Sequence, residues 1–206
     1  ARNYLGRPFG GGDWDFGIAR TELTTSSWVQ FLNSFGAVQV PEGHTWSAGI
    51  EHLLQGLGVG SGATFYERGP AGRPVWVIQA EGGSRPVPGA DWYGGAAFCN
   101  WLHNDRRVSV DALLTGAYDL RTFDIRASET WTDIPREAAA RYWLPTYDEW
   151  AVASFYDAAQ DDPLSGGWWS HLNRRARAGI AGRPGEGETS AGWDAFPQHL
   201  LLPVAA

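Results

Sequence analysis

The pattern of apolar positions predicts a helix in the N-terminal part of the chain. Four apolar residues follow an i, i+3, i+4, i+7 spacing, so they share one face of a helix over residues 26–35. These residues are Trp28, Phe31, Leu32 and Phe35. Gly36 follows directly and is expected to end the helix. We therefore expect an amphipathic helix that packs against a core.

A second helix is predicted over residues 91–103, with Asp91 as its N-terminal cap. One face carries Trp92, Ala96, Cys99 and either Leu102 or His103, and Phe98 and Trp101 widen it. Gly94 and Gly95 weaken the first turn, because glycine has a low helix propensity. Packing against the core must therefore hold this helix together.

The rest of the pattern predicts short elements joined by loops. Strands are expected at residues 16–20, 75–79 and 142–144, the last one ended by Pro145. A short helix is expected at residues 50–57 and a Gly-rich loop over residues 56–65. Residues 104–140 are expected to be loop-like around a short segment at 117–120, and residues 161–193 show no clear periodicity.

Residues 141–157 carry the clearest local signal. Thr146 stands three residues before Glu149, which is the spacing of a capping box. In that motif the hydroxyl caps an early helical N–H, and the carboxylate accepts the N–H of the cap residue. Asp148 and Glu149 lie in the first turn, where the helix dipole favours negative charge. We therefore predict a strand, a tight corner and a capped helix that carries Trp150 into a core.

The composition is that of one globular domain with many aromatic contacts. The 206 residues are 43% hydrophobic and include 12 Trp, 27 Gly and 12 Pro, which suggests short elements and long ordered loops rather than a helix bundle. A net charge of −7 argues against a nucleic-acid surface, which needs a basic patch. We expect a single domain over residues 1–206.

Three features bear on the compartment of the protein. The sequence contains no Met, so we expect Ala1 to be a processed or trimmed end, consistent with a removed signal peptide. No apolar stretch reaches the roughly 18–20 residues that a transmembrane helix needs. Cys99 is the single cysteine, so no intrachain disulfide can form, and the redox compartment stays open.

Three separated stretches together resemble one protein family. They are ARTELTTSSWVQFLN (19–33), PVPGADWYGGAAFCNWLHN (86–104) and RYWLPTYDEWAVAS (141–154). In this order they resemble the opening strand–turn–helix, the second helix and the Arg-Leu-Pro-Thr-x-x-Glu-Trp signature of the formylglycine-generating enzyme, or sulfatase-modifying factor, domain. The resemblance covers about residues 16–160, with residues 1–15 as an N-terminal arm and 161–206 divergent. Within the family, the sequence most resembles the exported bacterial members.

The resemblance implies an α+β fold. Such a domain is a loop-rich module related to C-type lectins, in which a few amphipathic helices flank small antiparallel sheets. Five tryptophans are then expected to be pins of the core: Trp28, Trp92, Trp101, Trp143 and Trp150.

The oxidase chemistry of the family is not expected in this chain. The family uses a pair of cysteines in the last third of its domain to bind copper and activate oxygen, and that third also carries calcium ligands. The sequence ends about where that third is expected to begin, and the Gly-Asn-Val-x-Glu-Trp and Gly-Gly-Ser-Trp stretches are missing from it. Cys99 matches the second-helix cysteine and is expected to be a small buried apolar residue. We therefore expect no catalytic residue and no cofactor; calcium is left open by the resemblance.

Other chemistries find little support in the sequence. The histidines His44, His52, His103, His171 and His199 are scattered, without the spacing of a metal site. Gly58, Gly60 and Ala63 fit a loose dinucleotide-binding pattern, but no strand precedes them and no helix follows. Asp148 and Glu149 point apart as neighbours on a helix, which argues against an acid–base pair. A Ser-His-Asp triad stays open, without a Gly-x-Ser-x-Gly motif to support it.

Residues 168–177 form the most site-like surface feature of the sequence. Trp168 and Trp169 precede three arginines, which are Arg174, Arg175 and Arg177. Tryptophan beside arginine is the composition of a protein-interface hot spot. The alternative is an ordered loop whose tryptophans pack on their own domain. We expect that packing for Trp168, and contact with a partner for Trp169 and the arginines.

Taken together, these observations predict a non-catalytic, exported binding or structural module. We expect an accessory subunit whose partners are other protein subunits, periplasmic or extracellular, attached peripherally to a membrane complex. Structural roles are expected for Thr146, Glu149, Trp150, Trp92, Trp101 and Cys99. One alternative is a relative of the oxidase whose catalytic third is missing from this chain, and another is a lectin-like ligand binder.

Overall fold

The computed structural model divides the chain into two compact units. The larger unit comprises residues 21–144 and 203–206, and the smaller unit comprises residues 1–20 and 145–202. The structure describes residues 16–35, 63–68, 74–78, 80, 82–87, 90–121, 134–157, 159, 167–171, 173, 175, 177, 179 and 180. The helix expected at 50–57 and the helix stop at Gly36 lie outside these residues. The single domain over residues 1–206 stays a prediction.

The first predicted helix is confirmed as α1 (Thr25–Phe35). Its predicted apolar face is buried: Trp28, Phe31, Leu32 and Phe35 are each at most 4% exposed. The first N–H groups of a helix have no partner within it. Here the Thr25 N–H donates to the Arg85 carbonyl at 2.8 Å. The Ser26 N–H donates to the Gly83 carbonyl at 2.9 Å, so a loop distant in sequence caps α1.

The second predicted helix is confirmed as α3 (Trp92–His103), with Asp91 at its N-cap. The Asp91 carboxylate accepts the Gly94 N–H at 2.7 Å. The buried surface is broader than the predicted face and also includes Tyr93, Ala97 and Asn100. Gly95 allows a close approach, because a β-carbon there would lie 2.9 Å from Leu144 Cδ2. Close packing therefore accompanies the glycines that weaken the first turn.

Aromatic rings of α1 and α3 form the centre of the core. The ring centroid of Phe31 lies 5.4 Å from that of Phe98 and 5.5 Å from that of Trp101. Trp28 contacts Phe98 at 5.7 Å. Trp28 and Trp101 are 3% and 2% exposed, which confirms both as core pins. Two other predicted pins, Trp92 and Trp143, are partly buried and pack against this core.

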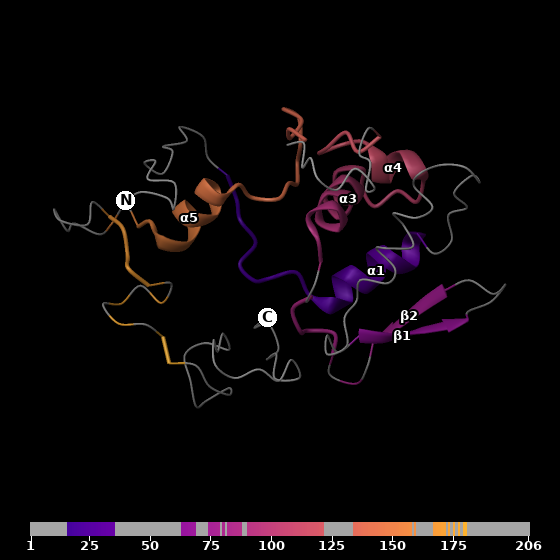
Figure 1. The fold of residues 1–206 in the computed structure, drawn as a ribbon, viewed down its shortest axis with the longest axis horizontal. Helices are drawn as coiled ribbons and strands as arrows, with labels where there is room; N and C mark the ends of the chain where they lie inside the picture. The colour runs from indigo at the N-terminus through magenta and orange to yellow at the C-terminus, as the bar shows by residue number, and fades with distance from the viewer. Residues whose placement is uncertain are drawn as a thin grey trace, which may run out of the picture. The chain divides into compact units, whose positions relative to one another are not determined.

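A β-hairpin lies beside α1 (Figure 1). It consists of β1 (Ala63–Arg68) and β2 (Pro74–Ile78), which pair in antiparallel fashion. β2 confirms the strand expected at 75–79, but not its complete burial, since Val77 and Ile78 are 43% and 36% exposed. β1 begins inside the stretch expected to be a Gly-rich loop, so that expectation is wrong from Ala63 onward. Pairing with β2, rather than local composition, decides the conformation there.

A side chain of α1 closes the outer edge of β2. The Asn33 Oδ1 accepts the Trp76 N–H at 2.8 Å, and the Asn33 Nδ2 donates to the Trp76 carbonyl at 3.0 Å. Both backbone groups of Trp76 therefore point away from its cross-strand neighbour Tyr66. An amide that imitates a neighbouring strand protects this edge from pairing with another chain.

A short helix, α4 (Val110–Leu114), lies in the region expected to be loop-like, and that expectation is wrong there. Five residues are too few to show a helical period in the sequence. The helix begins at Ser109, whose hydroxyl accepts the Ala112 N–H at 3.2 Å. Three of its residues are buried: Ala112, Leu113 and Leu114. The helix therefore adds to the core of the larger unit.

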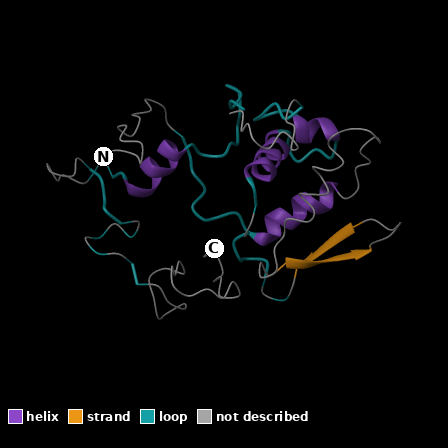
Figure 2. Ribbon diagram, in the orientation of Figure 1, coloured by secondary structure: helices purple, strands orange, loops and turns teal. Residues whose placement is uncertain are grey.

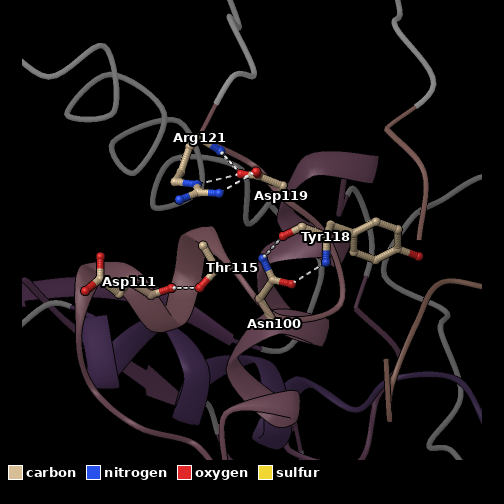
Figure 3. Close-up of polar contacts among 6 residues, drawn as sticks. All are labelled: Asn100, Asp111, Thr115, Tyr118, Asp119 and Arg121. Atoms are coloured by element: carbon tan, nitrogen blue, oxygen red, sulfur yellow. Dashed lines mark hydrogen bonds and ion pairs between the residues drawn. The ribbon is translucent and has the colours of Figure 1, made fainter. Parts of the chain in front are cut away.

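A buried amide joins α3 to the segment that follows α4 (Figure 3). Asn100 donates to the carbonyls of Leu113 at 2.7 Å and Tyr118 at 2.9 Å. The Asn100 side-chain oxygen Oδ1 accepts the Tyr118 N–H at 2.8 Å. One turn later, Asn104 donates to the Thr115 carbonyl at 2.7 Å. These four bonds fasten the C-terminal end of α4, and the segment that follows it, to α3.

The strands expected at residues 16–20 and 142–144 do not form, and the prediction is wrong for both. At the second site the Leu144 N–H donates to the Tyr118 hydroxyl at 2.9 Å. Tyr118 itself makes an isolated β-bridge to Arg136. Because a side-chain hydroxyl takes the place of a partner strand, the apolar run before Pro145 stays irregular.

The last helix of the described residues is α5 (Tyr147–Phe155), in the smaller unit. Over the described residues the chain forms α1, β1, β2, α3, α4 and α5, with more helix than strand (Figure 2). This content is mixed α and β, as the sequence predicts at the level of fold class.

Candidate functional site

α5 begins at the predicted capping box, which is confirmed. The Thr146 hydroxyl accepts the Glu149 N–H at 3.1 Å, and the Glu149 Oε2 accepts the Thr146 N–H at 2.8 Å. Glu149 is only 5% exposed. Its carboxylate is thus committed to the helix end, which agrees with our argument against an acid–base pair with Asp148.

α5 turns its large aromatic residues toward solvent. Tyr147 and Trp150 are 49% and 40% exposed, and Tyr156, directly after the helix, is 39% exposed. The prediction that Trp150 is a core pin is therefore wrong. The buried residues of α5 are Glu149 and Ala151. At 3.6 residues per turn, Trp150 lies opposite the direction midway between these two neighbours, so their burial turns it outward.

We call the residues Tyr147, Trp150 and Tyr156 the α5 aromatic face. Tyr147 and Trp150 are three positions apart and share one side of the helix, with ring centroids 6.1 Å apart. Trp150 also meets the ring of Phe155 edge-on at 5.6 Å. Each ring has an aromatic neighbour in the smaller unit, which limits its freedom before any partner binds.

The segment 167–169 runs beside the end of α5. Tyr156 and Trp168 form an isolated antiparallel β-bridge, and the Asp157 N–H donates to the Gly167 carbonyl at 2.9 Å. Gly167 has a φ of +86°, and a β-carbon there would lie 3.0 Å from the Tyr156 ring. Glycine at this position therefore allows both the turn and the close approach to the aromatic face.

The predicted Trp/Arg surface lies partly in this segment. Trp168 packs on its own unit, with its ring centroid 5.4 Å from that of Tyr156. The Trp169 N–H donates to the Phe155 carbonyl at 2.8 Å, and its buried indole Nε1 has no hydrogen-bond partner in the part of the chain described here. Arg175 and Arg177 are exposed, and Arg174 lies outside the described residues. The contact of Trp169 and the arginines with a partner stays a prediction.

Cys99 lies on α3 in the larger unit and is 6% exposed, which confirms it as a buried residue. Burial raises the pKa of its thiol to about 12. The thiol is therefore protonated at neutral pH, and a protonated thiol is a poor nucleophile and a poor metal ligand.

The other titratable groups bear on metal binding. Among the described residues, no three His, Cys, Asp or Glu side chains gather in a way that could hold a metal ion. His103 lies at the end of α3 and His171 in the smaller unit. The other histidines, His44, His52 and His199, lie outside the described residues. The expectations about cofactors stay predictions.

Neither the exposure of Trp150 nor the two tyrosines of the α5 aromatic face were predicted from the sequence. A signal for Tyr147 was present, since it stands three residues before Trp150 and both lie on one side of a capped helix. No comparable signal marked Tyr156, because its neighbour Trp168 comes from a separate segment.

Comparison of the chain with family models, with curated proteins and with solved structures gives no significant match. None of the helices over the described ranges has both the length and the apolar character that crossing a bilayer requires.

Proposed function

We propose that this chain is a non-catalytic, exported binding module, an accessory subunit of a larger protein assembly. The α5 aromatic face is the observation that carries the proposal. Its three members, which are between 39% and 49% exposed, present large rings to solvent from one helix and the residue after it. Tyrosine and tryptophan are enriched among residues that dominate the energy of protein interfaces.

The surroundings of this face suit a protein partner. The ring of Trp168 packs against Tyr156, and the ring of Phe155 packs against Trp150. Because these contacts already restrict the two side chains, less conformational entropy is lost when a partner buries them. Arg175 and Arg177 follow in the same unit and are exposed. Arginine is enriched at protein interfaces, because it combines charge with stacking on aromatic rings.

The cysteine chemistry of the resembled family does not fit this sequence. Two thiolates are needed for copper in that family, whereas the 206 residues contain one cysteine. That cysteine is buried with a raised pKa, which leaves it neutral at physiological pH. We therefore place the function in binding rather than in oxidation.

The resemblance supports the finer part of the proposal. The three family-like stretches include both core helices and the Thr146 capping box. On this basis we propose a sulfatase-modifying-factor fold of the C-type-lectin kind for the whole chain. The likeness to exported members supports a periplasmic or extracellular location, with peripheral attachment to a membrane complex.

The test begins with native mass spectrometry of the protein isolated from its source. We expect the 22.5 kDa chain in a complex of fixed stoichiometry. The identified partner is then titrated against the chain and against the double variant Tyr147→Ala/Trp150→Ala. Loss of two exposed aromatic contacts at an interface should raise the Kd at least about tenfold.

Tyr142→Ala is the matched control, because Tyr142 is 47% exposed but lies in the larger unit. Its Kd should stay within about twofold of the parent chain, since substitutions outside hot spots cost little. An isolated chain that is monomeric, or a complex that the double variant leaves unchanged, would contradict the proposal.

A further inference from the structure

A residue far along the chain binds the C-terminal end of α3. Arg141 lies 38 positions after His103, and its backbone N–H donates to His103 Nδ1 at 3.2 Å. The Arg141 Nη2 donates both to the His103 carbonyl and to Asp105. The distance to the Asp105 carboxylate is 2.6 Å. One arginine thus contacts the ring, the carbonyl and the turn at the end of the helix.

The His103 ring is also restrained from its other edge. A β-carbon on Gly116 would lie 3.1 Å from His103 Cδ2, so the loop after α4 passes close to the imidazole. Gly116 has a φ of +138°, which residues with a side chain rarely adopt. The ring therefore lies between the Gly116 loop and the Arg141 backbone.

The bond from Arg141 requires a neutral imidazole. A neutral ring accepts through the nitrogen that carries no proton, whereas an imidazolium donates through both nitrogens. Protonation of His103 therefore sets its Nδ1–H against the Arg141 N–H and removes one hydrogen bond. Histidine is the side chain whose charge commonly changes between about pH 5 and 8.

The charged groups around the ring lie on two elements. The turn after α3 carries Asp105, whose carboxylate also interacts with Arg107, and the segment 141–144 contributes Arg141; residues 115–117 carry no charge. A hydrogen bond from Arg141 lowers the pKa of Asp105, so this carboxylate keeps its charge near neutral pH.

We propose that His103 is an acid-sensitive latch: its neutral ring accepts the N–H of Arg141, the first residue of the segment 141–144, and its protonation breaks this bond and releases that amide. The segment is the last part of the larger unit before the chain enters the smaller unit at Pro145. Release exposes the Arg141 amide and loosens the contact with the α3 end. This inference does not depend on the proposed binding function.

The test is hydrogen exchange of the Arg141 amide in the full chain between pH 5.8 and 7.5, corrected for intrinsic exchange. The range stays above the sequence pI of about 5.1, where the chain is least soluble. Losing one hydrogen bond should lower the protection factor about three- to tenfold at the acid end. The Asn104 amide, bonded to the Asn100 carbonyl at 3.0 Å, should not change in this range.

His103→Asn is the diagnostic variant, because an asparagine Oδ1 lies near the position of Nδ1 and does not titrate. Protection of the Arg141 amide should then be independent of pH. His171→Asn, in the smaller unit, is the control and should behave like the parent chain. A pH-independent parent chain, or a His103→Asn chain that keeps the same pH dependence, would overturn the latch.

A second measurement does not depend on the folding of any variant. Nitrogen NMR of the parent chain reports which imidazole nitrogen carries the proton at pH 7.5. The proposal requires a proton on Nε2 and none on Nδ1 of His103. A protonated Nδ1 at that pH would overturn it.

Discussion

Cys99 and Asn100 are neighbours on α3 and are both buried, but they contribute differently to the fold. Cys99 fills space as a neutral thiol. Asn100 has no exposed surface and uses three hydrogen bonds to satisfy backbone groups of Leu113 and Tyr118. Figure 3 shows the two bonds to Tyr118. Because an unpaired buried polar group is costly, the amide at position 100 matters more than its small volume suggests.

We predict that Asn100→Leu strongly destabilises the larger unit. The variant leaves a buried N–H and two buried carbonyls without their partner, which should lower the free energy of unfolding by about 2–5 kcal/mol. Urea unfolding followed by far-UV circular dichroism measures the loss. Asp119→Asn is the control: Asp119 pairs with exposed Arg121 nearby and should change little. Equal stability of Asn100→Leu and the parent chain would contradict the role of the amide.

We predict that Cys99 reacts slowly with a thiol reagent while the chain is folded. At pH 8 the raised pKa of about 12 leaves almost no thiolate, so the native rate should be at least about a hundredfold below that in denaturant. Absorbance of the released reagent measures both rates. Rapid native labelling would show that Cys99 is accessible and ionised.

The same burial makes stability depend on alkaline pH. The pKa of Cys99 is higher in the folded chain than its ordinary value of 9.0, so its contribution is complete below pH 9 and declines as the pH rises toward 12. Burial also raises the pKa of Tyr93, which acts in the same direction. Cys99→Ala should therefore reduce the slope of stability against pH without abolishing it.

At the scale of elements, one side chain of α1 covers the open edge of the β-hairpin. Asn33 occupies the position of a third strand by bonding both backbone groups of Trp76. A two-stranded hairpin is marginally stable alone, so its contact with α1 is part of what keeps it folded. The α5 capping box is a second device of this scale, but it acts within one turn.

We predict that Asn33→Ala both destabilises the chain and promotes association. Two hydrogen bonds are lost, at a cost of about 1–3 kcal/mol, and the outer edge of β2 becomes open to another strand. Thermal unfolding measures the first effect, and light scattering below the midpoint measures the second. Ser34→Ala is the matched control on α1, since among the described residues its hydroxyl bonds only the Gln30 carbonyl of its own helix. Similar behaviour of the two variants would contradict a protected edge.

At the scale of the whole molecule, our prediction concerns cooperativity. A single domain over residues 1–206 should unfold in one step, as small single domains usually do. Tryptophan fluorescence and far-UV circular dichroism should then give the same midpoint in urea. Two separate transitions would show that the larger and smaller units of the chain unfold independently, and would contradict the single domain.

Local signals in the sequence predict those helices whose apolar spacing or N-terminal cap lies within or next to the helix itself. α1 and α3 follow from the spacing of their apolar residues, and Asp91 and Thr146 follow from the chemistry of helix caps. These signals are reliable because each involves side chains within one or two turns. The α5 aromatic face was missed for the same reason: a capped helix is visible in sequence, but the direction of its buried side is not.

By itself, the sequence determined two amphipathic helices, a capped third helix, one buried cysteine and a mixed α and β content. Only the tertiary structure decided the pairing of β1 with β2, the presence of α4 and the outward direction of Trp150. It also brought together Asn33 and Trp76, 43 positions apart, and His103 and Arg141, 38 positions apart. The physical reason is the sequence distance over which each interaction acts. A helix cap or a helical period involves residues within one or two turns. A strand edge, the His103–Arg141 bond and the exposure of a helix face depend on whether residues distant in sequence pack there.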